Sequence, residues 1–385
     1  MRFLLFPISW IYGIIVWFRN MLFNTNILSS KSFDIPIISI GNITVGGTGK
    51  TPHTEYLVRL LNQKYQVAVL SRGYKRKNKG FFLANSQSQV AEVGDEPLQM
   101  KRKFPELIVA VDESRIDGIQ KLMDEKKNKF IDVILLDDAF QHRYVIPSIN
   151  ILLIDYNRML YEDTLLPAGN LREPAGQMER ADIVIISKCP KALKPIEIRL
   201  LSKRLNLFPF QSLYFTTMQY GSLKTLTPLT SELNIQTAQH KANTRKVGNV
   251  KDDKYRDDLT MDQIKNEKIP VLIIAGVASP QSLIDYVRIY CPDAQSILFS
   301  DHHEFSKKDA HKIGLAFEKI KASEGIIIST EKDVMRIQNN PFMEMFISSI
   351  YYLEVQVHFL EGQGLSFDQK ILEYVRINRR NHGLA

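Results

Sequence analysis

Cysteine is scarce in this sequence: the 385 residues include two, Cys189 and Cys291, which lie in separate segments. Two distant cysteines supply neither a disulfide framework nor the paired spacing of a zinc finger, and this fits a reducing compartment. The sequence also contains no histidine- or cysteine-rich segment of the kind that loads metal ions. Disulfide scaffolds, metal fingers and metallochaperones are therefore disfavoured.

The sequence contains no nucleic-acid-binding module and no aromatic residues interleaved with a basic cluster, although its formal net charge is +8. A positive charge of this size still indicates an anionic partner. We therefore expect a membrane surface with acidic lipids and no nucleic acid. The composition is otherwise globular, with 44% hydrophobic residues, and the length allows two domains with their own cores.

The N-terminal residues 3–18 form an uncharged apolar run between Arg2 and Arg19. A cleaved signal peptide needs small residues just after such a run, and residues 19–23 supply none. Sixteen helical residues span about 24 Å, less than the roughly 30 Å hydrocarbon core. Two tryptophans, a tyrosine and the flanking arginines instead favour a monotopic helix inserted at one interface. A helix packed on the protein's own core is the alternative.

A glycine-rich loop follows the apolar residues 35–40 and ends at Lys50-Thr51, where we expect a helix to begin. This arrangement suits a triphosphate, because backbone amides converge on the anion, the lysine reaches the outer phosphates and the threonine hydroxyl ligates Mg²⁺. Thr44 occupies the first glycine position of the general motif, so the match is not strict. The predicted nucleotide-binding residues are Thr44, Val45, Gly46, Gly47, Thr48, Gly49, Lys50 and Thr51. A plain glycine-rich turn is the alternative.

Paired acids, Asp137 and Asp138, end the apolar segment 133–136. Two adjacent carboxylates repel each other unless they share a cation, so we expect Mg²⁺ there. Further along the chain, Gln141 and His142 fall at the same predicted sheet edge. Another acidic pair, Asp95-Glu96, opens a predicted helix, where helix capping alone is an alternative explanation.

Short apolar segments alternate with helical segments along most of the chain, which predicts an α/β fold. We expect a P-loop NTPase-type, mostly parallel sheet with helices on both faces, followed by a second, smaller α/β lobe. Residues 230–268 are polar and predict a loose surface insertion. The predicted strands beyond the P-loop are 67–70, 107–111, 133–136, 150–155, 182–187, 271–275, 296–299, 326–329 and 351–357.

Several separated motifs resemble those of the tetraacyldisaccharide 4′-kinase family of lipid A biosynthesis. The matching segments are 41–52, 70–74, 94–97, 137–142, 166–173, 301–302 and 330–333. Together with the N-terminal apolar helix they span nearly the whole chain. Two departures are Ala139, where the family usually has glycine, and Asn170, at a position that is more often proline.

The resemblance implies an enzyme that transfers the γ-phosphoryl group of ATP to the 4′-hydroxyl of a tetraacylated glucosamine disaccharide 1-phosphate, giving lipid IVA. It implies Mg²⁺ and monotopic association with the cytoplasmic face of the inner membrane, and we expect a monomer. The corresponding segments are a membrane-anchoring helix over 1–24, a P-loop kinase domain over 25–215, a linker with a polar insertion over 216–269, and a C-terminal lobe over 270–385 that closes the active-site cleft.

Under this hypothesis Asp95 is the general base, and by resemblance His302 from the C-terminal lobe orients it. The catalytic set is Asp95, His302, Lys50 and Asp138. The predicted Mg²⁺ ligands are Thr51, Glu96, Asp137 and Asp138. Arginine suits the acceptor side because its fork matches a phosphate. The predicted substrate-binding residues are Arg72, Tyr74, Arg115, Gln141, His142, Asn170 and Arg172.

A membrane-associated positioning ATPase that works as a switch is the main rival hypothesis. That class also has a G-G-x-G-K-T loop and a membrane helix, but it places a lysine immediately before the two glycines. Here that position is Val45. A metallochaperone GTPase is a third hypothesis, which the missing metal-loading segment argues against.

Overall fold

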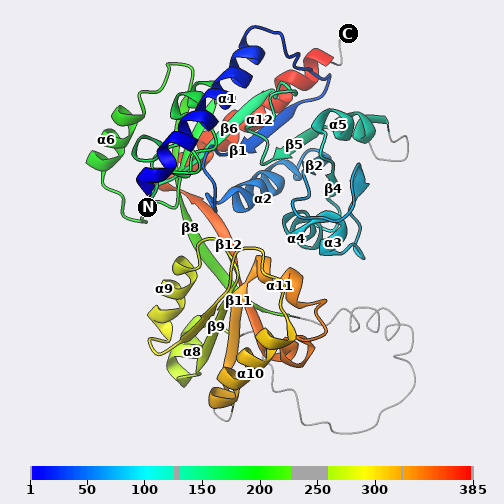
Figure 1. Cartoon of the computed structure of the whole chain (residues 1–385). Helices are drawn as coiled ribbons and strands as arrows, with labels where there is room; N and C mark the ends of the chain where they lie inside the picture. The colour runs from blue at the N-terminus through cyan, green and yellow to red at the C-terminus, as the bar shows by residue number, and fades with distance from the viewer. Residues whose placement is uncertain (1, 125–130, 227–258, 322–323, 383–385) are drawn as a thin grey trace. The chain divides into compact units, whose positions relative to one another are not determined.

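The computed structural model describes residues 2–124, 131–226, 259–321 and 324–382 (Figure 1). The chain forms two compact units: unit 1 comprises Met1–Gln219 and Gln356–Ala385, and unit 2 comprises Tyr220–Val355. Most of the polar segment 230–268 lies outside the described residues, and its last part contains helix α8 (Met261–Glu267).

Unit 1 is built on a sheet whose strands follow the order β3-β4-β2-β5-β1-β6-β7-β8. All neighbours are parallel except β3, which pairs antiparallel with β4. The central strands are buried over their whole length, as expected for a parallel sheet covered on both faces. The strands are β1 (Ile37–Gly41), β2 (Val67–Ser71), β3 (Phe82–Leu83), β4 (Ile108–Val111), β5 (Val133–Asp137), β6 (Ile149–Asp155), β7 (Ile183–Ser187) and β8 (Ser212–Thr225).

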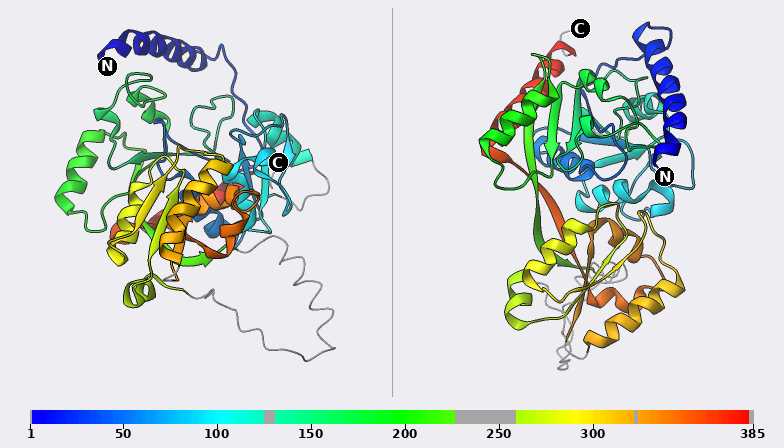
Figure 2. Two further views of the ribbon diagram at one scale, coloured as in Figure 1. Left: turned by 60° about the horizontal axis from the view of Figure 1, so that its bottom comes forward. Right: turned by 60° about the vertical axis from the view of Figure 1, so that its left-hand side comes forward.

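Helices cover the sheet of unit 1, which confirms the predicted α/β class (Figure 2). Ile119 and Leu122 of α5 pack with Ile37, on one face of the sheet. The α-helices of this unit are α1 (Phe6–Asn24), α2 (Lys50–Leu61), α3 (Val90–Val93), α4 (Asp95–Lys103), α5 (Arg115–Asp124), α6 (Pro195–Leu205) and α12 (Gln363–His382). Short 3-10 turns are η1 (Arg2–Leu5), η2 (Leu160–Glu162), η3 (Ala175–Arg180) and η5 (Leu360–Gly362).

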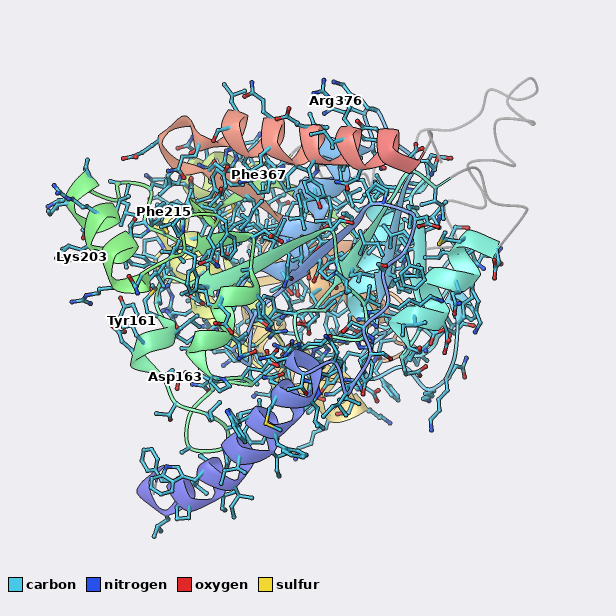
Figure 3. The ribbon with its side chains drawn as sticks, turned by 90° about the horizontal axis from the view of Figure 1, so that it is seen from above. Tyr161, Asp163, Lys203, Phe215, Phe367 and Arg376 are labelled. Carbon is cyan, nitrogen blue, oxygen red and sulfur yellow. The ribbon has the colours of Figure 1, made fainter. Side chains whose placement is uncertain are left out.

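The last helix, α12, belongs to unit 1 although we expected it in the C-terminal lobe. Phe367 of α12, labelled in Figure 3, is buried. Its ring lies 5.2 Å from that of Tyr214 in β8. In addition, Asp368 accepts a hydrogen bond of 2.8 Å from the hydroxyl of Tyr56 in α2. The chain thus returns to unit 1 after it leaves unit 2. The packing of α12 on unit 1 is a long-range contact that no local sequence pattern predicts.

Unit 2 contains a four-stranded parallel arrangement in the order β10-β9-β11-β12. These strands lie where the sequence predicted them: β9 (Val271–Ala275), β10 (Gln295–Leu298), β11 (Ile326–Thr330) and β12 (Ile350–Phe359). Its helices are α8, α9 (Gln281–Tyr290), α10 (Lys307–Lys321), α11 (Glu331–Ile337) and the turn η4 (Glu344–Ser349). Ile273 and Ile328 from the strands pack with Leu283 and Val287 of α9 in its core.

Candidate active site

The P-loop joins β1 to α2, and glycine permits its shape at two places. Gly49 caps α2 with φ of 86°, a left-handed conformation that other residues adopt at a cost. At Gly41 a Cβ would lie 2.7 Å from the backbone nitrogen of Phe140, so a side chain there would collide with the segment that follows Asp138. The loop and the acidic segment therefore lie against each other.

The N-terminus of α2 is suited to an anion. No side chain caps it, and its first turn contains no acid, within the part of the chain that the structure describes. Free amide groups and the positive end of the helix dipole therefore face the position where a phosphate is expected. Lys50 and Thr51 are the first two residues of this helix.

Lys50 is held by two acceptors. Its ammonium nitrogen lies 3.4 Å from Asp138 Oδ1, and it donates a hydrogen bond of 3.3 Å to Asn42 Oδ1. Arg172 also contacts Asp138, at 3.3 Å. Burial alone would raise the pKa of Asp138, but the two cations outweigh it and hold that pKa below its ordinary value. Asp138 therefore stays ionised and lies between two positive side chains.

Asp137, the last residue of β5, lies in a different environment. It is 1% exposed and accepts a hydrogen bond of 3.1 Å from Thr54 Oγ1. Burial, followed by the nearby charges of Glu96 and Asp138, raises its pKa to about 7. The three predicted acids of the metal site thus lie close enough to interact, and a cation among them would relieve this repulsion.

Among the described residues, no group of three or more His, Cys, Asp and Glu side chains is arranged to hold a metal ion by itself. Mg²⁺ at nucleotide sites typically takes one or two carboxylates, with phosphate oxygens and water completing the octahedron. Carboxylates at Asp137 and Asp138 with a hydroxyl at Thr51 match that donor set. The residues present therefore fit a Mg²⁺ ion that arrives together with a triphosphate.

The predicted base, Asp95, opens α4 and is 6% exposed. Gly94 before it has φ of 89°, and a Cβ on Gly94 would lie 3.1 Å from the carbonyl oxygen of Tyr74. The segment containing Arg72 and Tyr74 therefore packs beside the start of α4. Glu96, one residue on, is near enough to influence Asp137. Asp95 thus belongs to the same edge of unit 1 as the P-loop and the paired acids.

His302 belongs to unit 2, and its pairing with Asp95 of unit 1 remains a prediction. Its backbone has φ of 61°. Its Nε2 lies 3.2 Å from Lys332 Nζ and its Nδ1 lies 3.1 Å from a guanidinium nitrogen of Arg336. A neutral imidazole accepts at one nitrogen only, so one of these two donors faces an N–H group.

The predicted substrate-binding residues fall into two groups. Arg72 and Tyr74 are exposed, whereas Arg115 is 2% exposed and donates to the carbonyl oxygens of Asp112 and Asp137 at 2.8 and 3.0 Å. Burial lowers the pKa of Arg115 to about 10. Burial, then the charges of Arg115, Arg19 and Arg72, lower the pKa of His142 to about 4. The three arginines form a positive region around the neutral imidazole of His142.

Gln141 and Asn170 form hydrogen bonds inside the protein. Gln141 Nε2 donates to the carbonyl oxygen of Asn42 at 2.8 Å, and the Gln141 carbonyl accepts from Arg19 of α1 at 2.7 Å. Asn170 Nδ2 donates to Asp163 at 2.9 Å, and its carbonyl accepts from the amide of Val45. Both residues therefore support the P-loop.

Four residues that the sequence analysis missed hold the P-loop from the ends of β6 and β7. Arg158 donates to the carbonyl of Val45 at 3.1 Å, and Lys188 donates to the carbonyl of Gly47. Asp155 contacts both cations, at 3.4 and 2.8 Å. Ser187 Oγ donates to the carbonyl of Thr48 at 2.7 Å. Asp155 and Ser187 are strand-terminal polar residues, the signal that identified Asp137, so they could have been found the same way.

His53 in α2 supports the same loop and yields a testable prediction. Its Nδ1 lies 2.7 Å from the carbonyl of Gly49 and its Nε2 lies 3.0 Å from Thr216 Oγ1. Burial lowers its pKa to about 4. As pH falls from 6.5 to 4 the unfolded chain binds a proton that folded His53 rejects, so this residue lowers the free energy of unfolding by roughly 3 kcal/mol across that window.

We therefore expect His53→Gln to show a weaker loss of unfolding free energy between pH 6.5 and 4 than the wild type, measured by urea unfolding. The exposed His311→Gln serves as control and keeps the wild-type slope. A His53→Gln profile parallel to that of the wild type would contradict the assignment.

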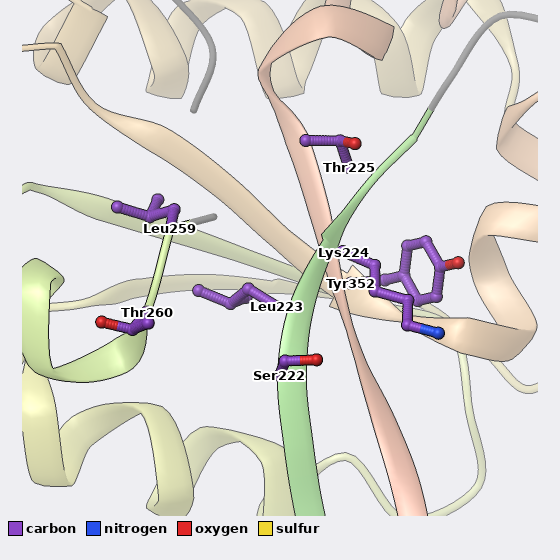
Figure 4. A pocket seen from close by; sticks show the side chains of 7 residues that line it. All are labelled: Ser222, Leu223, Lys224, Thr225, Leu259, Thr260 and Tyr352. Atoms are coloured by element: carbon purple, nitrogen blue, oxygen red, sulfur yellow. The ribbon is translucent and has the colours of Figure 1, made fainter. Parts of the chain in front are cut away.

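The described residues line hollows in both units. One, of about 320 Å³, lies beside the 139–142 segment of unit 1 and includes Ser39, His142 and Asn150 in its lining. The other, of about 570 Å³, lies in unit 2 between the end of β8 and the residues before α8 (Figure 4). Its lining consists of Ser222, Leu223, Lys224, Thr225, Leu259, Thr260 and Tyr352. Lys224 is already paired with Glu354 at 2.6 Å, so this hollow offers no catalytic group.

Comparisons with known proteins agree with one another. The family model described as Tetraacyldisaccharide-1-P 4′-kinase matches residues 1–376. A tetraacyldisaccharide 4′-kinase of Phocaeicola vulgatus is 48% identical over 99% of this chain and 97% of its own length. One from Bacteroides thetaiotaomicron is 45% identical over 99% and 95%. The crystal structure of LpxK from Aquifex aeolicus in complex with ATP has the same fold, with a TM-score of 0.68, 24% identity, and coverage of 97% of this chain and 99% of that one.

Proposed function

Because the chain belongs to the tetraacyldisaccharide-1-P 4′-kinase family, we propose that it transfers the γ-phosphoryl group of ATP to the 4′-hydroxyl of a tetraacylated glucosamine disaccharide 1-phosphate. The product is the corresponding 4′-phosphate, lipid IVA. The observation that carries the proposal is Lys50, held between Asn42 and Asp138 at the start of a helix whose N-terminus is free for phosphate.

In the proposed reaction the 4′-oxygen attacks the γ-phosphorus and forms a new P–O bond. The bond between the γ-phosphorus and the β–γ bridging oxygen breaks, and ADP leaves. Asp95 accepts the hydroxyl proton, and Lys50 with the P-loop amides neutralises charge on the phosphates. Thr51 and acids of the set Glu96, Asp137 and Asp138 would hold Mg²⁺, which would supply further charge neutralisation. His302 orients Asp95 in this scheme.

The acceptor is proposed to bind at the positive region formed by Arg72, Arg115, His142 and Arg172. Arg72 is exposed and free to turn toward an anion, while Arg115 contributes its charge from a buried position. A neutral His142 offers a hydrogen bond without adding charge. Because arginine binds phosphate through two parallel hydrogen bonds, this region suits the 1-phosphate of the disaccharide.

A transfer assay tests the proposal. Purified protein is incubated with ATP labelled at the γ-phosphate and with the acylated disaccharide 1-phosphate in detergent, and lipids are separated from nucleotides. We expect label in the lipid at one equivalent per ADP formed. A switch ATPase would instead release labelled inorganic phosphate and leave the lipid unchanged, and that result would reject the proposal.

The N-terminal helix supports a membrane location through the way it packs. Among the described residues α1 is the helix that is long and apolar enough to cross a membrane by length and composition. Most of its large apolar side chains nevertheless lie on the outside: Trp10 is 75% exposed and Ile14 is 66% exposed. Figure 3 shows the outer side chains of α1 projecting away from unit 1.

The inner side of α1 combines the buried Val16 and Phe23 with polar side chains that bond to unit 1. The Tyr12 hydroxyl donates to the carbonyl of Arg172 at 2.8 Å, and Ser9 Oγ accepts from the amide of Ala168 at 2.9 Å. Arg19 lies 3.7 Å from Glu173. A spanning helix would be surrounded by lipid, whereas one side of α1 is bonded to unit 1. We therefore propose monotopic insertion of the outer side, at the cytoplasmic face where ATP is available, by a single chain.

Charges on this outer side are expected to release the protein from membranes. The double variant Ile11→Glu/Ile15→Glu changes residues that are 60% and 61% exposed, and we expect at least a tenfold loss of binding to anionic vesicles in a flotation assay. The matched control Ile289→Glu/Leu315→Glu changes similarly exposed residues of unit 2, at 65% and 60%, and keeps wild-type binding. Equal losses in both variants would refute the monotopic orientation.

A further inference from the structure

Asn42 is a buried polar residue to which the mechanism assigns no role. It follows Gly41 at the end of β1 and is 0% exposed. Both ends of its side-chain amide and its backbone carbonyl form hydrogen bonds. Oδ1 accepts from Lys50 Nζ at 3.3 Å, and Nδ2 donates to Thr48 Oγ1 at 2.8 Å. The backbone carbonyl accepts from Gln141 Nε2 at 2.8 Å.

These contacts place the side-chain amide of Asn42 between Lys50 and the P-loop, the two parts of the site that are expected to bind phosphate. The acceptor end of Asn42 holds the lysine, while the donor end holds the loop through Thr48 and, more weakly at 3.5 Å, through the carbonyl of Gly46. The asparagine side chain offers an acceptor and donors on two separate atoms, so it can hold both partners at once. Aspartate lacks the donors and leucine lacks both.

The charge of the two lysine partners differs. Asp138 is an anion that also contacts Arg172, whereas Asn42 is neutral. A neutral acceptor orients an ammonium group more weakly than a carboxylate does, so it competes less with incoming phosphate oxygens. A lysine that is already oriented also loses less side-chain entropy when ATP binds.

We propose that Asn42 is a positioning residue that preorganises the Lys50 ammonium group for the triphosphate. The proposal rests on the proposed use of ATP. It concerns ATP binding alone, so it can be tested apart from transfer to the lipid.

The test is a double-mutant cycle on the full chain, read as the dissociation constant of a fluorescent ATP analogue with Mg²⁺. We expect Asn42→Ala to weaken binding about tenfold in the wild-type background, which corresponds to about 1.4 kcal/mol. In a Lys50→Met background the same change is expected to cost less than about twofold, because the lysine that it orients is gone. Asn42→Asp, which is isosteric, also weakens binding because its carboxylate holds Lys50 more tightly.

Asn150→Ala is the matched control. Asn150 is another buried asparagine of the same sheet, 8% exposed, and its Nδ2 donates to the carbonyl of Arg180. We expect it to leave ATP affinity unchanged. If Asn42→Ala weakens ATP binding equally with and without Lys50, the role of Asn42 is structural and the proposal is overturned. Unchanged ATP affinity in both Asn42→Ala and Asn42→Asp would overturn it too, because Asn42 would then have no role in binding. A wild type that binds ATP through Lys50 but phosphorylates no lipid would reject the proposed function and leave Asn42 assigned.

Discussion

Lys50→Met lowers the turnover of lipid phosphorylation by about a thousandfold or more, which is the largest effect we expect from a single substitution. Methionine preserves the length of the side chain and removes its charge. Lys50 contributes the charge that is closest to the expected phosphates, and a preorganised cation in a phosphoryl-transfer site typically has an effect of this size. The measurement is the initial rate of label transfer at saturating ATP, together with the ATP dissociation constant.

Removal of Lys50 also leaves Asp138 with one cation, Arg172, in place of two. We therefore expect ATP binding to weaken as well. Lys64→Met is the control, because Lys64 is exposed just beyond the end of α2. Nucleotide binding and transfer that survive unchanged in Lys50→Met, with Lys64→Met also normal, would remove the P-loop from the mechanism.

Asp95→Asn is expected to reduce turnover by a factor between about 10² and 10⁴, the usual contribution of a general base. ATP affinity is expected to change less than threefold, because the amide keeps the size of the side chain and leaves the P-loop intact. The rate is measured at saturating ATP, so that a change in nucleotide affinity does not enter the comparison. Near-normal turnover in Asp95→Asn would exclude Asp95 as the base.

Helix capping is the competing explanation for Asp95, and the chain offers a direct control. Asp117 is an exposed acid in the first turn of α5, so Asp117→Asn removes a comparable interaction with a helix dipole. We expect it to lower stability by less than 1 kcal/mol and to leave turnover unchanged. If His302 orients Asp95, the loss of turnover in the double variant with His302→Ala should be close to that of Asp95→Asn alone.

The P-loop could be found from the sequence because its function requires contiguous residues. Backbone amides that converge on a phosphate must be neighbours in the chain, and the left-handed turn at Gly49 needs glycine. Asp137 and Asp138 were identifiable for a similar reason, since they directly follow a buried strand whose apolar residues are easily recognised.

Asn42 and Lys188 could not be assigned in the same way. Lys188 acts on a residue far from it in the chain, and Asn42 acts through a single amide side chain that no local pattern marks. Lys188 contacts the carbonyl of Gly47, 141 positions earlier in the chain. Strand β8 was also missed: its mixed polar and apolar residues do not form the buried run that marks a central parallel strand.

The N-terminal helix shows a different limit. Its apolar composition predicted a membrane element, yet composition does not reveal which side of the helix faces the protein. Tyr12 and Arg19, which read as interfacial residues in the sequence, instead donate to carbonyls of the segments that carry Arg172 and Gln141. The side chains that face outward are the large apolar ones.

The central claim is that a triphosphate held by the loop before Lys50 receives its attack from the side of Asp95. The most direct measurement is a crystal structure of the protein with Mg²⁺ and a non-hydrolysable ATP analogue. We predict that Lys50 Nζ lies within hydrogen-bond distance of the γ-phosphate and that the Asp95 carboxylate lies opposite the β–γ bridging atom, in line for attack. A nucleotide bound elsewhere, or an Asp95 on the leaving-group side of the γ-phosphorus, would contradict the account.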